Sequence, residues 1–121
     1  MTTKAELYLH ALSELESSTG DIISTAIITY DGLIMASTRS DTMNRETFAA
    51  YGAATFKRAG ETMEELTGEN IDMLIYESIN HRVVTARAGK YALLIVLTGK
   101  NVQMGLVLIN VQNTARKIKE L

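Results

Sequence analysis

Hydrophobic positions in the first twenty residues recur at the spacing of an amphipathic helix. Thr3 and Glu6 stand at the spacing of a capping box, in which the first side chain accepts a hydrogen bond from the third helical amide. Gly20 follows a polar Ser-Ser-Thr run and suits a left-handed helix cap. The pattern therefore predicts a helix over about residues 3–18. Its apolar stripe consists of Ala5, Tyr8, Leu12 and Leu15.

The residues after Gly20 predict a β-hairpin. Ile and Thr are frequent in residues 22–30, and both residue types are favoured in strands. Asp31-Gly32 follows directly, and a second apolar segment covers residues 33–36. Asp-Gly between two apolar segments is a strong signal for a tight turn, because both residues tolerate a positive φ. We therefore expect two antiparallel strands joined at Asp31-Gly32.

The longest amphipathic pattern lies in residues 45–66. Charged residues occupy one side, where Lys57 and Glu61 are spaced to form a helix-stabilising pair. We expect a long helix that ends at Gly68, with its apolar stripe facing the core. That stripe consists of Phe48, Gly52, Phe56, Ala59, Met63 and Leu66. Small residues form a second row beside it: Ala49, Ala53 and Gly60.

The second half of the chain predicts three strands and a final helix. The β-type segments cover residues 71–76, 81–88 and 91–98. Met104 to Leu121 returns to helical spacing and carries basic residues near its end, as suits a helix C-terminus. The element order is therefore α-β-β-α-β-β-β-α. Tight turns imply antiparallel strands, so we predict one α/β (α+β) domain over residues 1–121, with three helices covering a single sheet.

Composition and charge narrow the class of protein. Of the 121 residues, 46% are hydrophobic and 21% charged, which excludes a largely disordered chain. Twelve basic and 14 acidic side chains give a formal charge of −2, so nothing indicates binding to nucleic acid or to anionic lipid. The longest apolar run, Tyr91 to Leu97, is too short for membrane insertion, and the first residues do not resemble a secretion signal. We expect a soluble, cytoplasmic protein.

The sequence has no combination of residues typical of an enzyme. Cysteine is absent, which excludes thiolate metal sites and a cysteine nucleophile. His10 and His81 are the only histidines, too few for a metal site. Gly99-Lys100 lacks the upstream glycine and the following Ser or Thr of a phosphate-binding loop. We expect no catalytic residue, no metal and no cofactor. The acidic cluster in the long helix is interpreted as a solvated face: Glu61, Glu64 and Glu65.

Several arginines are candidates for contact with a partner protein, because an inserted arginine can stabilise charge during phosphoryl transfer. Arg39 and Arg45 flank a polar loop, and Arg58 lies on the long helix. Arg82 and Arg87 lie on a strand. Each has a structural alternative, since Arg58 can pair with a glutamate one turn later and strand arginines often protect a sheet edge.

Two features suggest that the chain pairs with a second copy. The row of small residues would let another helix approach closely, although packing within one chain explains it equally well. The strand 71–76 has no Pro and one charge, so at a sheet edge it would offer unpaired backbone groups; an interior position is the alternative. We predict a homodimer, which Ala53→Glu would disrupt by burying a charge. The expected interface residues are Ala49, Ala53, Phe56, Gly60, Met73 and Ile75.

Four segments follow one another in an order that resembles a known family: Asp31-Gly32-Leu33-Ile34-Met35-Ala36-Ser37, Phe48-Ala49-Ala50-Tyr51-Gly52-Ala53-Ala54, the helix closing at Gly68, and the strand Ile71 to Tyr76. With the opening helix and the apolar strand up to Leu97, they resemble the Roadblock/LC7 family, specifically its short prokaryotic MglB-like members. The resemblance implies a five-stranded antiparallel sheet in the order 2-1-5-4-3, between one long helix and two terminal helices. It also implies dimers in which the long helices pack together and the third strands join two sheets into one of ten strands.

The resemblance implies a binding function. Dimers of this family regulate or scaffold small Ras-like GTPases, and MglB-like members act as GTPase activators. We therefore expect a non-enzymatic homodimeric regulator or scaffold of such a GTPase, with Tyr51, Arg58, Arg39 and Arg45 nearest to the partner. Two alternatives remain open. One is a pure scaffold or light-chain-like subunit of a larger complex, and the other is a small-molecule sensor with a pocket between sheet and helices.

Overall fold

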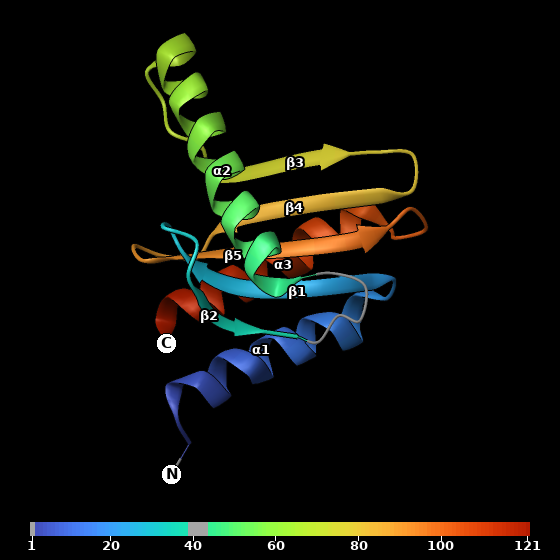
Figure 1. The fold of residues 1–121 in the computed structure, drawn as a ribbon. Helices are drawn as coiled ribbons and strands as arrows, with labels where there is room; N and C mark the ends of the chain where they lie inside the picture. Colours follow the sequence, from blue (N-terminus) through green and yellow to red (C-terminus); the bar gives the residue numbers. More distant parts are fainter. Residues whose placement is uncertain (1, 39–43) are drawn as a thin grey trace.

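A computed structural model describes residues 2–38 and 44–121 of the chain (Figure 1). Three helices and five strands follow one another in the predicted order. They are α1 (Lys4–Thr19), β1 (Ile22–Thr29), β2 (Ile34–Ser37), α2 (Arg45–Thr67), β3 (Met73–Glu77), β4 (His81–Arg87), β5 (Ala92–Gly99) and α3 (Met104–Glu120).

The five strands form one antiparallel sheet in the order β2-β1-β5-β4-β3. This order confirms the fold class and the strand order implied by the family resemblance. β5 lies at the centre and is apolar over most of its length, as expected for a strand covered on both faces. α2 crosses one face of the sheet, and α1 and α3 lie side by side on the other (Figure 1).

Each face of the sheet has its own hydrophobic core. Beneath α1 and α3, the buried residues include Leu12, Leu15, Val107 and Val111. Beneath α2, they include Phe56, with Ile95 of β5 among the strand residues. The alternation of side chains along β5 supplies both cores, because successive residues point to opposite faces.

Local signals explain where most elements begin and end. Thr3 caps α1 as predicted, since its hydroxyl accepts a hydrogen bond from the Glu6 amide at 3.2 Å. Gly68 ends α2 in the left-handed conformation. Gly20 also has a positive φ of 74°, but its ψ of 157° is extended, so the predicted left-handed cap is wrong here. The chain leaves α1 directly in the extended direction of β1.

The first hairpin turns through a longer loop than the Asp31-Gly32 pair suggested. β1 and β2 are joined by residues 30–33, and of these only Gly32 has a positive φ, at 91°. The loop is closed by the Gly32 amide, which donates to the Thr29 carbonyl at 3.0 Å. Gly32 also passes close to α2, since a Cβ there would lie 3.3 Å from the Ala50 Cα.

The buried face of α2 is rotated from the predicted stripe towards the row of small residues. At Gly52 the helix lies so close to β5 that a Cβ would collide with Cδ1 of Ile95. Met63 and Leu66, predicted to face the core, are instead exposed. The buried residues of α2 are Ala49, Gly52, Ala53, Phe56 and Gly60.

The C-terminal part of α2 extends past the edge of its own sheet (Figure 1). In that view the end of the helix lies beyond β3, and every residue from 61 to 67 is exposed. The apolar stripe of the sequence therefore continues onto a part of the helix that this chain does not cover.

Candidate functional site

β3 is an edge strand, so of the two positions left open for segment 71–76 the interior one is wrong. The hydrogen bonds at its two ends establish which backbone groups are free. The Arg87 amide donates to the Asp72 carbonyl, and the Ser78 amide donates to the His81 carbonyl, each at 2.9 Å. In an antiparallel pair these bonds occur at every second residue. The even-numbered residues of β3 therefore pair with β4, and the backbone groups of Met73, Ile75 and Glu77 point to the open edge.

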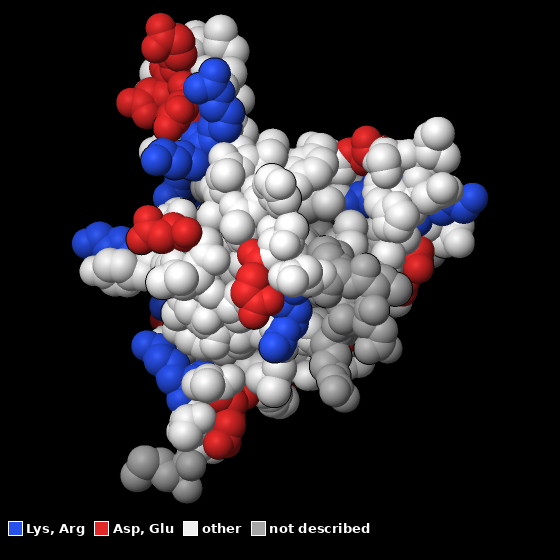
Figure 2. Space-filling view, in the orientation of Figure 1, with Lys and Arg blue, Asp and Glu red and all other residues white. Residues whose placement is uncertain are grey.

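An apolar groove adjoins this edge on the α2 side of the sheet. We call it the α2–β3 groove; its volume is about 230 Å³. Figure 2 shows that the surface beside α2, above β3, is largely uncharged, whereas acidic side chains gather at the tip of α2. The groove is lined by Thr47, Phe48, Tyr51, Gly52, Tyr76, Val83 and Leu97.

Exposed residues of two kinds lie on α2. An apolar residue is exposed at its C-terminal end, and a tyrosine and an arginine are exposed on its outer surface. Leu66, at the tip, is 75% exposed. Tyr51 is 73% exposed, and the side chain of Arg58 is 83% exposed. Tyr51 and Arg58 are seven positions apart, so they lie two turns apart along one line of the helix. Arg58 also lies 3.7 Å from Glu61, which is the ion pair considered from the sequence.

The other predicted partner residues differ in position. Arg45 begins α2 and its guanidinium donates to the Ser37 hydroxyl at 3.1 Å, so it bridges α2 and β2. Arg39 lies outside the described residues. Arg82 and Arg87 lie on β4, an interior strand, so the alternative that they protect a sheet edge is wrong.

The predicted dimer residues fall into two groups. Ala49, Ala53, Phe56 and Gly60 are buried within their own chain, which agrees with the alternative of packing within one chain. These four side chains therefore have little exposed surface that could contact a second copy. Met73 and Ile75 lie on the free edge, and Ile75 is 41% exposed.

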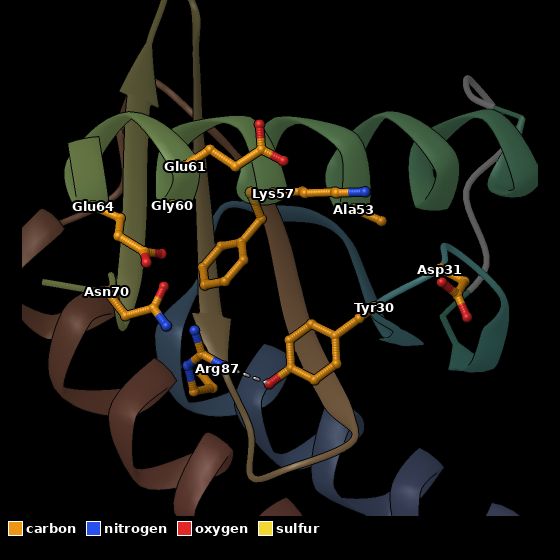
Figure 3. Close-up of a pocket in the computed structure, with 10 residues that line it drawn as sticks. Tyr30, Asp31, Ala53, Lys57, Gly60, Glu61, Glu64, Asn70 and Arg87 are labelled. Atoms are coloured by element: carbon orange, nitrogen blue, oxygen red, sulfur yellow. Dashed lines mark hydrogen bonds between the residues drawn. The ribbon is translucent and has the colours of Figure 1, made fainter. Parts of the chain in front are cut away.

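A second cavity, the Arg87 pocket, opens on the other flank of α2 (Figure 3). Its volume is about 400 Å³. Arg87 lies at its floor, with its guanidinium carbon 5.5 Å from the ring centre of Tyr30 and 5.6 Å from that of Phe56. No local pattern in the sequence indicates this pocket, because Tyr30 and Arg87 lie 57 residues apart. It is lined by Tyr30, Asp31, Ala53, Phe56, Lys57, Gly60, Glu61, Glu64, Asn70 and Arg87.

Arg87 is held in the pocket by hydrogen bonds as well as by the rings. Its guanidinium donates to the Tyr30 hydroxyl and to the Ile71 carbonyl, each at 3.1 Å. The Tyr30 hydroxyl in turn donates to the Gly89 carbonyl at 2.9 Å. These bonds join the first hairpin to the residues just before β3 and just after β4, so the position of Arg87 is determined by tertiary contacts.

The described residues contain no group of three His, Cys, Asp or Glu side chains arranged to hold a metal ion. Among the same residues, no helix is both long and apolar enough to cross a membrane.

Comparisons with known proteins agree with this architecture. A model of the Roadblock/LC7 domain matches residues 9–98. An uncharacterised protein of Methanocaldococcus jannaschii is 29% identical over 110 residues, which cover 91% of this chain and 95% of that protein. The gliding protein MglB of Thermus thermophilus has a TM-score of 0.87 at 18% identity, over 99% of this chain and 91% of that chain. An MglB with a tetrameric arrangement has a TM-score of 0.88 at 18% identity, over 99% and 90%. Both solved structures share the fold.

Proposed function

The chain belongs to the Roadblock/LC7 family, and on that premise we propose that it acts as a homodimeric regulator of a small Ras-like GTPase. The role is binding rather than chemistry. It follows the function that the family resemblance implies, and it requires two surfaces, one for a second copy and one for the GTPase. The tetrameric arrangement of one similar MglB supports assembly from several copies.

The open edge of β3 supports pairing with a second copy. Three residues, Met73, Ile75 and Glu77, turn backbone donors and acceptors outward, and the strand contains no proline. An exposed edge of this kind is a template for strand addition. Antiparallel pairing of β3 with its own copy would satisfy these groups across a two-fold axis, which is the commonest symmetry of protein oligomers.

The extending end of α2 supports the same arrangement. Because α2 passes beyond β3, a two-fold copy joined at β3 would receive this end above its own β3 and β4. That surface contains the α2–β3 groove, whose exposed Tyr51 and Tyr76 would then meet apolar residues such as Leu66. Burial of apolar area would add to the strand pairing.

The outer surface of the paired α2 helices is the proposed contact for the GTPase. Arg58 is exposed there, and arginine is among the residue types most often found at the energetic centre of interfaces. A regulator shifts the GTPase only if it binds one switch conformation more tightly than the other. GTPase activation would follow if the favoured conformation is the one that hydrolyses GTP.

The observation that carries this proposal is the division of α2 into a packed part and an uncovered end. The helix packs on the chain's own sheet up to Gly60, while Met63 and Leu66 near its end and its outer line of exposed residues have no cover in this chain. We assign these two surfaces to a second copy and to a GTPase because such partners are what the family resemblance implies.

The experiment measures GTP hydrolysis by a small P-loop GTPase encoded beside the gene for this chain, with and without the purified protein. We expect the wild type to raise the hydrolysis rate several-fold and the variant Arg58→Ala to lose most of that effect. Arg116→Ala is the matched control, because Arg116 is also an exposed helical arginine but lies on α3. Binding without a change in rate would support the scaffold alternative, and absence of binding would contradict the proposal.

A further inference from the structure

The Arg87 pocket is separate from the surfaces used by the proposed function. Its α2 residues begin at Ala53 and recur at helical spacing up to Glu64, whereas the α2–β3 groove uses the earlier positions 47, 48, 51 and 52. By helical periodicity these two sets lie on opposite flanks of α2. A second copy seated on the groove would therefore leave the Arg87 pocket open.

Arg87 presents a fixed cationic group to this pocket. Two of its five N–H groups donate to the Tyr30 hydroxyl and the Ile71 carbonyl, and its side chain is 34% exposed. Asp72 lies 3.9 Å from Nε, at the limit of an ion pair, and is itself almost fully exposed. The guanidinium therefore keeps donors for a carboxylate, and its orientation is already set by the two rings.

The opposite wall of the pocket carries acceptors at its Glu64 end, and Lys57 lies two turns earlier on the same helix. Figure 3 shows the Glu64 carboxylate and the Asn70 amide directed into the space between α2 and Arg87. Among the described residues, no basic group lies within 4.0 Å of the Glu64 carboxylate, whereas Glu61 pairs with Arg58. Glu64 also lies in the last turns of α2, where the helix dipole disfavours a negative charge. A cation from a ligand would relieve both effects.

The remaining lining fits a small organic molecule. Ala53, Gly60 and Phe56 provide an apolar surface on the α2 side, and Gly60 leaves room where a side chain would project. A volume of about 400 Å³ lies within the range of small-molecule sites. A simple anion would be attracted by Arg87 but repelled by Glu64. A simple cation would be attracted by Glu64 but repelled by Arg87. A molecule with both charges satisfies both walls.

We propose that the Arg87 pocket binds a small zwitterion of the α-amino acid type. Its carboxylate accepts hydrogen bonds from Arg87, its ammonium group donates to Glu64 and Asn70, and its side chain packs on the apolar surface formed by Ala53, Phe56 and Gly60. The site would let the state of a GTPase regulator depend on an amino-acid-like metabolite.

The test titrates the purified chain with each of the common L-amino acids at neutral pH, by calorimetry and by chemical-shift changes. At least one amino acid should bind saturably, and its N-acetyl and carboxamide derivatives, which each lack one charge, should bind at least tenfold more weakly. Equal binding of the N-acetyl derivative would overturn the proposal, because the ammonium group would then not be recognised. So would the absence of binding by every amino acid.

Glu64→Gln tests the assigned wall without disturbing the fold, because Glu64 is exposed and outside the two cores. It should weaken binding at least tenfold. Glu65→Gln is the matched control, since the neighbouring residue carries the same charge but does not line the pocket. Equal loss in both variants would overturn the site assignment. No GTPase is present in these titrations, so their outcome is independent of the proposed function.

Discussion

Gly52 and Gly60 lie on the buried face of α2, yet the structure requires a glycine at only one of them. A Cβ at Gly52 would collide with Ile95, whose side chain is fully buried and cannot move freely. A Cβ at Gly60 would lie 3.6 Å from Oδ1 of Asn70 and 3.7 Å from Cγ1 of Ile71, which are ordinary contacts. The close approach of α2 to β5 therefore depends on the first glycine.

Alanine substitution at the two glycines should therefore have opposite effects on stability. Gly52→Ala should lower the free energy of unfolding by about 1–3 kcal/mol through overpacking against Ile95. Gly60→Ala should raise it by up to about 1 kcal/mol, because alanine loses less backbone entropy in a helix. Urea denaturation of both variants measures the difference. A stabilised Gly52→Ala protein would contradict the packing described for α2 and β5.

At the scale of elements, the two terminal helices are joined by side-chain contacts on their exposed sides. The Lys117 ammonium on α3 donates to the Glu14 carboxylate on α1 at 2.9 Å. This hydrogen bond and the positive charge of Lys117 lower the pKa of Glu14 below its ordinary value, against a small opposing effect of desolvation. The contact spans 103 residues of sequence, so it adds to the packing of α1 on α3.

This contact predicts a pH dependence. Because folding lowers the pKa of Glu14, its stabilising contribution is present above the pKa of the unfolded chain and is lost as the pH falls through the lower folded pKa. Glu14→Gln should therefore lower the melting temperature slightly at about pH 7 and have no effect at about pH 2, where the carboxylate is protonated. Added salt should reduce the difference at neutral pH. Glu69→Gln, an exposed loop variant, is the control and should show no such pattern.

The open edge of β3 predicts that the loss of a single outward-facing backbone amide weakens self-association. The Ile75 amide faces the open edge, so proline at this position removes one donor for a second copy without removing a hydrogen bond to β4. Ile75→Pro should raise the dimer dissociation constant at least tenfold by sedimentation equilibrium. Ile75→Val keeps the amide and should leave the constant nearly unchanged. Similar dissociation constants for both variants would mean that β3 does not form the interface.

At the scale of the whole molecule, α2 separates two surfaces with different chemistry. On one flank lies the uncharged α2–β3 groove beside the open edge, and on the other lies the Arg87 pocket with its charged walls (Figures 2 and 3). One helix therefore borders the surface proposed for self-association and the pocket proposed for a metabolite. This arrangement would let occupancy of the pocket influence how α2 meets its partners.

Self-association also predicts how the whole molecule melts. If two copies fold together through β3 and α2, the melting temperature should rise with protein concentration, because association stabilises the folded state by mass action. Scanning calorimetry over a hundredfold range of concentration measures this dependence. Light scattering at the highest concentration should give twice the mass of 13.3 kDa. A constant melting temperature together with the mass of one chain would contradict the homodimer.

The sequence predicted features that depend on neighbouring residues. The order of helices and strands, the Thr3 cap and the hairpin all agree with the structure. These features follow from local hydrogen bonding, backbone preference and hydrophobic period, which a run of ten to twenty residues already contains. The predicted core stripe of the long helix was wrong in part. A hydrophobic pattern identifies the apolar side of a helix, but it does not show how much of that side is covered by the sheet.

The sequence alone therefore determined the secondary structure, the class of fold and the family, since these depend on patterns that recur within short segments. Only the tertiary structure decided which side of α2 meets the sheet, because that depends on the fit between Gly52 and the distant Ile95. It alone decided that Tyr30, Phe56 and Arg87 form one pocket, since contacts among residues far apart in the chain arise when the sheet and α2 close together.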